Sequence, residues 1–198
     1  MSGCRASKAE KIRMACENKG QACEEKLVDI IIDGKKCTVK KGTTILDVAK
    51  SIGIKIPTLC HHDDLCIAGI CRICLVEVVG MEVLQASCSY SIEREIEVKT
   101  HSHKIRKARR HILDLMLASH VGECYSCIRN GNCELQDLAE EYGITKFPFG
   151  HPNKPIKQID CSSMSIVRDM DKCILCRRCV RSCIDLQEVG VFGVKGRG

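Results

Sequence analysis

The cysteines constrain this chain more than any other feature of its sequence. The stretch "CHHDDLCIAGICRICLVEV", residues 60 to 78, holds four cysteines within its first fifteen positions. The whole chain of 198 residues contains 17 cysteines, far above ordinary usage. Such a density indicates either a framework of disulfides or bound metal.

Metal is favoured over disulfides. The N-terminal sequence "MSGCRASKAEKIRMACENKG" is polar and charged, without the apolar run of an export signal. We therefore expect a protein of the reducing cytoplasm, where disulfides are rare. The odd number of cysteines and the recurrent C-x2-C spacing also indicate metal. No apolar stretch approaches the length of a bilayer crossing, so we expect no direct membrane span.

Residues 1–26 form a polar extension in which we interpret Cys4, Cys16 and Cys23 as free thiols. From Leu27 the pattern changes: "LVDIIIDGKKCTVKKG" predicts two strands around an Asp-Gly turn. "TTILDVAKSIG" predicts a helix with a threonine cap and a terminal glycine. "ICLVEVVGMEVLQASC" and "REIEVKT" predict further strands, and Cys37 is expected to pack as a small apolar residue. Hairpin, helix, cysteine-rich loop and strands is the order of a β-grasp ferredoxin domain.

Residues 101–119, "HSHKIRKARRHILDLMLAS", predict an amphipathic helix with an apolar face. "ELQDLAEEYG" predicts another short helix, and the proline-rich "KFPFGHPNKPIK" predicts a loop between two modules. Basic residues on the first helix carry no nucleic-acid recognition motif, so we interpret them as solvated or partner-facing and expect no nucleic-acid partner. The predicted apolar face is Ile105, Ala108, Ile112 and Leu115, and the basic residues are Lys104, Arg106, Lys107, Arg109 and Arg110.

The first cysteine constellation has two registers. Thiolates are soft ligands suited to zinc or to iron–sulfur clusters. Cys66, Cys71 and Cys74 have the C-x4-C-x2-C spacing of plant-type ferredoxins. The alternative set has the spacing C-x10-C-x2-C-x13-C, and it is favoured because the plant-type loop takes its last cysteine much farther downstream. The first register stays open. The alternative set is Cys60, Cys71, Cys74 and Cys88.

"IPTLCHHDDLCIAGICRICLVEV", followed by Cys88, resembles a known domain. It is similar to the N-terminal 2Fe–2S domain shared by the large iron–sulfur subunit of respiratory complex I, iron-only hydrogenases and NAD-linked formate dehydrogenases. The resemblance implies one 2Fe–2S cluster and makes Cys66 the surplus thiol. The ligands that it implies are Cys60, Cys71, Cys74 and Cys88.

The second constellation, "HVGECYSCIRNGNC", reads H-x3-C-x2-C-x5-C. The same family uses this spacing for a His-ligated 4Fe–4S cluster. Zinc is the competing hypothesis, because three cysteines and one histidine make a good tetrahedral site. Two family motifs in the right order on one chain favour iron and sulfur. The ligands that the resemblance implies are His120, Cys124, Cys127 and Cys133.

The third constellation, "CILCRRCVRSC", reads C-x2-C-x2-C-x3-C and is typical of a 4Fe–4S cluster. In two-cluster ferredoxins the fourth cysteine of such a run ligates the other cluster, and this chain has no second run. Cys183 could close the same cluster, Cys161 could replace it, or Cys183 could face a cluster built with residues absent from this chain. We predict the first option. The predicted ligands are Cys173, Cys176, Cys179 and Cys183.

The sequence thus predicts an α+β protein in four regions. After the extension come a 2Fe–2S ferredoxin-type domain, a small helical module with the His-ligated 4Fe–4S cluster, and a ferredoxin-like 4Fe–4S segment. No phosphate-binding or dinucleotide-binding loop is visible, so we expect no substrate site of its own. The three cluster regions are residues 27–100, 101–160 and 161–198.

The resemblance implies an electron-transfer subunit of a multi-subunit oxidoreductase that exchanges electrons with NAD(P)H through a flavoprotein. Electron-bifurcating hydrogenases, formate dehydrogenases and transhydrogenases are of this type. They also have a further catalytic subunit, and some use ferredoxin as a second carrier. Two alternatives stay open: the N-terminal part of a longer hydrogenase-like catalytic subunit, and a zinc-stabilised adaptor with a basic helix.

Overall fold

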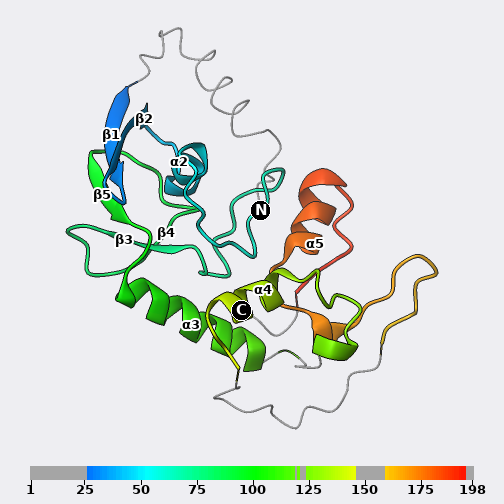
Figure 1. Cartoon of the computed structure of the whole chain (residues 1–198). Helices are drawn as coiled ribbons and strands as arrows, with labels where there is room; N and C mark the ends of the chain where they lie inside the picture. Colours follow the sequence, from blue (N-terminus) through cyan, green and yellow to red (C-terminus); the bar gives the residue numbers. More distant parts are fainter. Residues whose placement is uncertain (1–25, 119, 121–123, 146–158, 195–198) are drawn as a thin grey trace, which may run out of the picture.

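The computed structural model describes residues 26–118, 120, 124–145 and 159–194. Cys4, Cys16, Cys23 and the predicted proline-rich loop, residues 146–157, lie outside the described residues. The first part of the chain holds five strands and one helix, and the remaining helices, most of them short, follow (Figure 1). The elements are β1 (Leu27–Ile32), β2 (Lys35–Lys40), α2 (Ile45–Ser51), β3 (Leu75–Val78), β4 (Gln85–Ala86), β5 (Ile96–Lys99), α3 (His103–Ala118), η1 (Cys124–Ser126), α4 (Glu134–Glu141), η2 (Met170–Lys172), α5 (Arg178–Arg181) and η3 (Ser182–Leu186).

The five strands form one mixed sheet in the order β2-β1-β5-β3-β4. β1 pairs antiparallel with β2 and parallel with β5, and β5 pairs antiparallel with β3. A hairpin, a helix and a central parallel pair make up the β-grasp arrangement. The structure thus confirms the α+β class and the predicted hairpin, helix and strands. The long loop between α2 and β3 carries Cys60, Cys66, Cys71 and Cys74, and Cys88 follows β4.

Local sequence signals account for the hairpin and its helix. Asp33 and Gly34 both have positive φ, 48° and 81°, as a two-residue turn matching the twist of the strands requires. The Asp33 carboxylate also accepts hydrogen bonds from the backbone N–H and the hydroxyl of Thr100, which ties the hairpin to the end of β5. At the start of α2, Thr44 Oγ1 accepts the Asp47 N–H at 3.2 Å, satisfying one free donor of the first turn.

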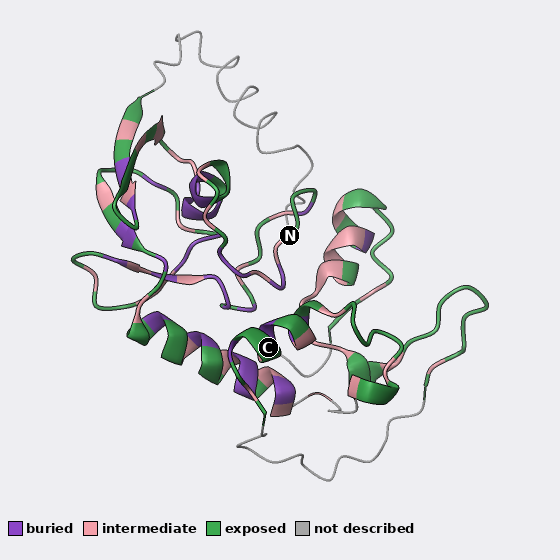
Figure 2. Ribbon diagram, viewed as in Figure 1, coloured by how far each residue is buried: buried purple, intermediate pink, exposed green. Residues whose placement is uncertain are grey.

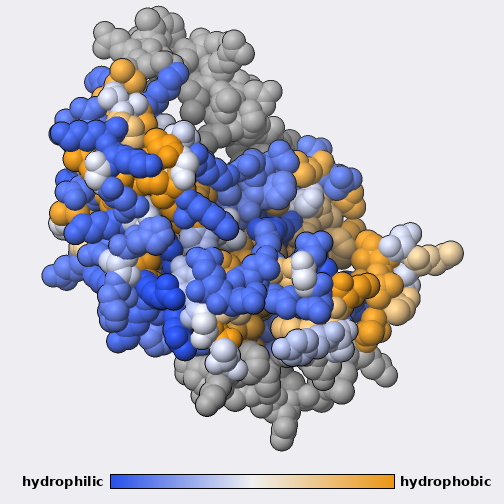
Figure 3. Space-filling model, in the orientation of Figure 1, coloured by the Kyte–Doolittle hydropathy of each residue, from blue (hydrophilic) through white to orange (hydrophobic). Residues whose placement is uncertain are grey.

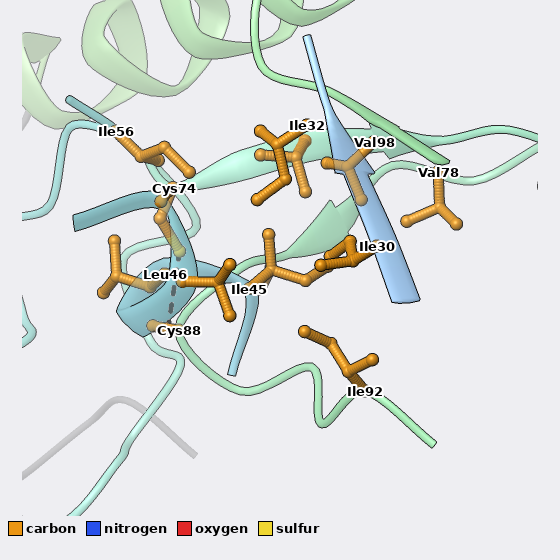
Figure 4. Packing of buried hydrophobic residues seen from close by; sticks show 14 residues of the cluster. Ile30, Ile32, Ile45, Leu46, Ile56, Cys74, Val78, Cys88, Ile92 and Val98 are labelled. Atoms are coloured by element: carbon orange, nitrogen blue, oxygen red, sulfur yellow. Dashed lines mark hydrogen bonds between the residues drawn. The ribbon is translucent and has the colours of Figure 1, made fainter. Parts of the chain in front are cut away.

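The first hydrophobic core lies between the sheet and α2 (Figure 4). Alternate residues of β1 enter it, because side chains of a strand point to opposite faces; Ile30 and Ile32 are fully buried. Cys37 on β2 packs against this core, as predicted, and its thiol donates to the Ile30 carbonyl at 3.7 Å. Cys74 and Cys88 belong to the same core.

A second core joins the cysteine loop to the helices that follow the sheet. Leu59 and Ile73 of the loop pack there with residues of α3 and α4. Figure 2 shows buried stretches in both helices. The core contains a cysteine from each of the three motifs. Cys60 and Cys71 are buried in it, and Cys133 and Cys176 pack against it. The three motifs, far apart in sequence, therefore converge on one apolar cluster.

Helix α3 is amphipathic as predicted, but its buried face differs from the predicted one. Leu115, expected on the apolar face, is 58% exposed, whereas Leu113 is fully buried. Arg109, interpreted from the sequence as solvated or partner-facing, is buried and donates to the Leu75 carbonyl at 2.7 Å and to the Tyr142 hydroxyl at 3.1 Å. These two bonds offset the cost of burying the guanidinium. The buried face of α3 therefore includes a charged residue.

The segment 159–194 exposes many large apolar side chains. Met164, Val167 and Val191 are among them. Figure 3 shows apolar surface at the right-hand edge of the molecule, where the first part of this segment lies in Figure 1. Contiguous exposed apolar surface marks an interaction site more often than a free surface. None of the helices in the described part of the chain is long and apolar enough to cross a bilayer.

Candidate metal centres

Four buried thiols lie together at the base of the cysteine loop. The sulfur atoms of Cys74 and Cys88 are 3.4 Å apart, and Cys60 and Cys71 are a second hydrogen-bonded pair. Each of the four cysteines is at most 7% exposed. The structure therefore brings together all four residues of the favoured register, and it does so as two pairs.

Within each pair, the two thiols shift each other's pKa in opposite directions. The hydrogen bond with Cys71 lowers the pKa of Cys60 to about 5, and the bond with Cys88 lowers the pKa of Cys74 to about 6. The same bonds raise the pKa values of Cys71 and Cys88, because the second proton of each pair is held by a neighbouring thiolate. Such a pocket holds four thiolates only when positive charge replaces the protons, as metal ligation does.

The arrangement in pairs fits two metal ions better than one. A 2Fe–2S cluster takes four thiolates spread over two irons. The hydroxyl of Ser87 is fully buried without a hydrogen-bond partner, yet it lies near enough to Cys74 to lower the pKa of that thiol. A sulfur acceptor at this place would satisfy it.

Cys66 stands apart from these four thiols. It is half-buried, and neither of the two thiol pairs includes it. The plant-type register needs the Cys66 sulfur beside Cys71 and Cys74. The geometry places Cys60 in that position instead.

A backbone amide two residues after a cysteine points at the cysteine sulfur in all three motifs. Amide donors stabilise thiolates and raise the reduction potential of clusters that they ligate. Two of these N···S distances are 3.4 Å. The donor and acceptor residues are Ile73 and Cys71, Arg129 and Cys127, and Leu175 and Cys173.

Left-handed residues shape two of the C-x2-C turns. Arg72 has a φ of 58°, and Leu175 and Arg177 on either side of Cys176 have φ of 58° and 56°. Non-glycine residues adopt this conformation rarely and at an energetic cost. This conformation lets each turn direct its amide and thiol groups toward one point, which is consistent with a binding site there.

The second constellation surrounds a cavity of about 570 Å³. α3 leads into His120, whose N–H donates to the Leu117 carbonyl at 3.0 Å. Cys133 occupies the N-cap position of α4, and its side chain makes no capping bond. Its thiol is therefore available to the cavity. It lies at the N-terminal end of a helix, where a thiolate is stabilised. All four predicted ligands line the cavity: His120, Cys124, Cys127 and Cys133.

The third constellation is less enclosed. Cys173 and Cys176 are half-buried and Cys179 is exposed, on the four-residue helix α5. Cys183 is 7% exposed, and the pKa of its thiol is lowered because the amides of residues 190–192 point at it, Phe192 foremost. Cys161, the alternative ligand, is exposed. The surroundings of Cys183 thus stabilise a thiolate.

Sequence reasoning missed two arginines among the cysteines. Arg181 donates to the backbone carbonyls of Cys60 and Cys66, and Arg178 pairs with Glu134 at 2.6 Å. These contacts connect the third motif to the other two. The only signal in the sequence was the basic character of "CRRCVRSC". Hydrophobic periodicity does not show which distant residues these arginines contact.

Two successive stretches of the chain match families of iron–sulfur domains. Residues 25–103 match the family described as "2Fe-2S iron-sulfur cluster binding domain". Residues 109–148 match the "NADH-ubiquinone oxidoreductase-G iron-sulfur binding region". Together these two matches define the class: the chain is an iron–sulfur protein.

Curated relatives and solved structures narrow the class. The chain is 44% identical over 177 residues to the "NADP-reducing hydrogenase subunit HndD" of Solidesulfovibrio fructosivorans, covering 87% of this chain and 30% of that protein. It is 35% identical over 173 residues to the mitochondrial "NADH-ubiquinone oxidoreductase 78 kDa subunit" of Candida albicans, covering 86% of this chain and 24% of that one. The chain thus spans less than a third of the length of these relatives.

A solved structure matches over a larger share of its length. A chain of the "NAD+-reducing [NiFe]-hydrogenase in the H2-reduced state" is 32% identical, with a TM-score of 0.78 over 86% of this chain and 71% of that chain. The present chain belongs to the family whose members share this N-terminal iron–sulfur region, among them the complex I 75/78 kDa subunits and NAD(P)-linked hydrogenase subunits.

Proposed function

We propose that the chain is an electron-transfer subunit of a multi-subunit NAD(P)H-linked oxidoreductase. In this role it receives and passes on single electrons between a flavin- and NAD(P)H-binding subunit and a further catalytic subunit. The relatives named as NADP-reducing and NAD+-reducing hydrogenases and as NADH-ubiquinone oxidoreductase subunits support this function.

The observation that carries the proposal is the convergence of the three cysteine motifs on the second core. Cys60, Cys71, Cys133 and Cys176 all contact this one apolar cluster. Iron–sulfur clusters supply one-electron redox chemistry when bound, and the protein supplies spacing and electrostatics. Metal centres held around one small core are near neighbours, as electron transfer between them requires.

We assign the ligands as follows. The two thiol pairs of the cysteine loop hold a 2Fe–2S cluster, the cavity with His120 holds a His-ligated 4Fe–4S cluster, and the last motif holds a second 4Fe–4S cluster. The burial of the first set and the shared cavity of the second support these assignments. The ligand sets are Cys60, Cys71, Cys74 and Cys88; His120, Cys124, Cys127 and Cys133; and Cys173, Cys176, Cys179 and Cys183.

Metal and sulfide analysis tests the proposal. Protein purified without oxygen should be brown and contain about ten iron atoms and as many acid-labile sulfides per chain, the content of one 2Fe–2S and two 4Fe–4S clusters. Electron paramagnetic resonance (EPR) of the reduced protein should show separate 2Fe–2S and 4Fe–4S signals. A colourless protein with stoichiometric zinc would contradict the proposal and support the adaptor hypothesis.

A second candidate function follows from the relative HndD, which is about three times as long as the matched region. In this reading the same iron–sulfur region delivers electrons to a catalytic site in one longer hydrogenase-like subunit. The mass of the native polypeptide and the subunits that copurify with it distinguish the two candidates.

The fourth ligand of the last cluster gives a separate prediction. Because Cys183 is buried beneath amides and Cys161 is exposed, Cys183→Ser should lose up to four irons per chain or change the spectrum of that cluster. Cys161→Ser is the matched control and should keep the full iron content. The reverse result would make Cys161 the ligand.

A further inference from the structure

The helix of the third cysteine motif carries two arginines that face the other two motifs. Arg178 and Arg181 are the first and last residues of α5, and residues three apart lie on the same side of a helix. Figure 1 shows α5 next to the loop between α2 and β3. The Nε–H group of each arginine is buried without a hydrogen-bond partner.

The two arginines differ in how their charge is balanced. The guanidinium of Arg178 is paired in a fork with the carboxylate of Glu134, with N···O distances of 2.6 and 3.2 Å. Arg181 instead donates to two carbonyl oxygens, those of Cys60 and Cys66. Among the described residues it forms no ion pair. These hydrogen bonds satisfy donors on Nη1 and Nη2 of Arg181 but leave its positive charge uncompensated.

We propose that Arg181 is a positioning and redox-tuning residue: it fastens the third cysteine motif to the 2Fe–2S loop and raises the reduction potential of the 2Fe–2S cluster. This inference rests on the proposed function. Reduction adds one negative charge to a site ringed by thiolates, and a nearby half-buried cation stabilises that added charge. The bond from the guanidinium of Arg181 to the Cys60 carbonyl places this charge beside one of the buried cysteines.

The test is a redox titration of the holoprotein, followed by EPR of the 2Fe–2S signal. Arg181→Gln should make reduction of this cluster at least about tenfold less favourable, a shift of 59 mV to more negative potential for one electron. Arg181→Lys keeps the charge but not the fork geometry, so it should recover most of the potential. Arg94→Gln is the control, since it removes an exposed arginine of the same domain, residues 25–103, that has no role at the cysteines, and it should shift the potential far less.

The outcomes separate this inference from the proposed function. An unchanged potential in Arg181→Gln, or equal shifts in Arg181→Gln and Arg94→Gln, would overturn the tuning role. If Arg181→Gln lost iron from the last cluster without any shift, the residue would be a structural fastener alone and the redox part would be wrong. Absence of any 2Fe–2S signal in the unmodified protein would instead contradict the proposed function.

Discussion

Replacing Cys60 with serine should abolish or strongly alter the 2Fe–2S signal, with the loss of about two irons per chain. Cys60 is buried beside Cys71, in the pair that we assign to one iron. A serine there is a poorer ligand for iron than a thiolate, and the burial of position 60 gives solvent little access to replace it as a ligand. EPR of the reduced protein and iron analysis measure the effect.

Cys66→Ser is the matched control, because both residues lie in one loop and both offer a backbone carbonyl to Arg181. Either substitution leaves that contact in place. Cys66→Ser should therefore keep the 2Fe–2S spectrum and iron content. If Cys66→Ser removed the cluster and Cys60→Ser did not, the plant-type register would be the right one.

Replacing Leu113 with alanine should lower the free energy of unfolding by about 2–5 kcal/mol, the usual cost of a cavity at a fully buried leucine. Leu113 lies on α3 and belongs to the second core, on which all three cysteine motifs converge. Thermal unfolding of the holoprotein under nitrogen should show a fall in Tm of at least about 5 °C.

Leu115→Ala provides the comparison on the same helix. Leu115 is 58% exposed, so its truncation should change the free energy of unfolding by at most about 0.5 kcal/mol. The opposite ranking of the two variants would mean that the face predicted from the sequence is the buried one, and that the orientation of α3 in the structure is wrong.

The sequence predicted well those features that depend on neighbouring residues. The turn at Asp33 and Gly34, the cap at Thr44 and the strand alternation around Ile30 follow from local conformational preferences. The groups of cysteines were equally visible, since ligand spacing is a local property of the chain. The assignment of individual ligands remains a prediction that the experiments above address.

Features that depend on tertiary partners were missed. No residue near Arg109 in the sequence indicates that its guanidinium donates hydrogen bonds to the Leu75 carbonyl and the Tyr142 hydroxyl. In the same way, the bond from Arg181 to Cys60 joins residues 121 positions apart. Periodicity places charged residues on the solvent side by default, so arginines with distant acceptors are assigned to the wrong face.

The burial of Cys60 and Cys71 in the second core has a kinetic consequence. Cys60 and Cys71 are 1% and 7% exposed and are covered by the second core, whereas Cys124, Cys127 and Cys133 line a cavity and are only half-buried. Oxidants and chelators reach the half-buried sulfurs from the folded state. To reach the buried ones they must wait for a local opening of the loop, which has its own free energy. Oxygen should therefore damage the two sites at rates that are limited differently. At the half-buried cysteines the limit is the collision rate, and at the buried cysteines it is the rate of local unfolding.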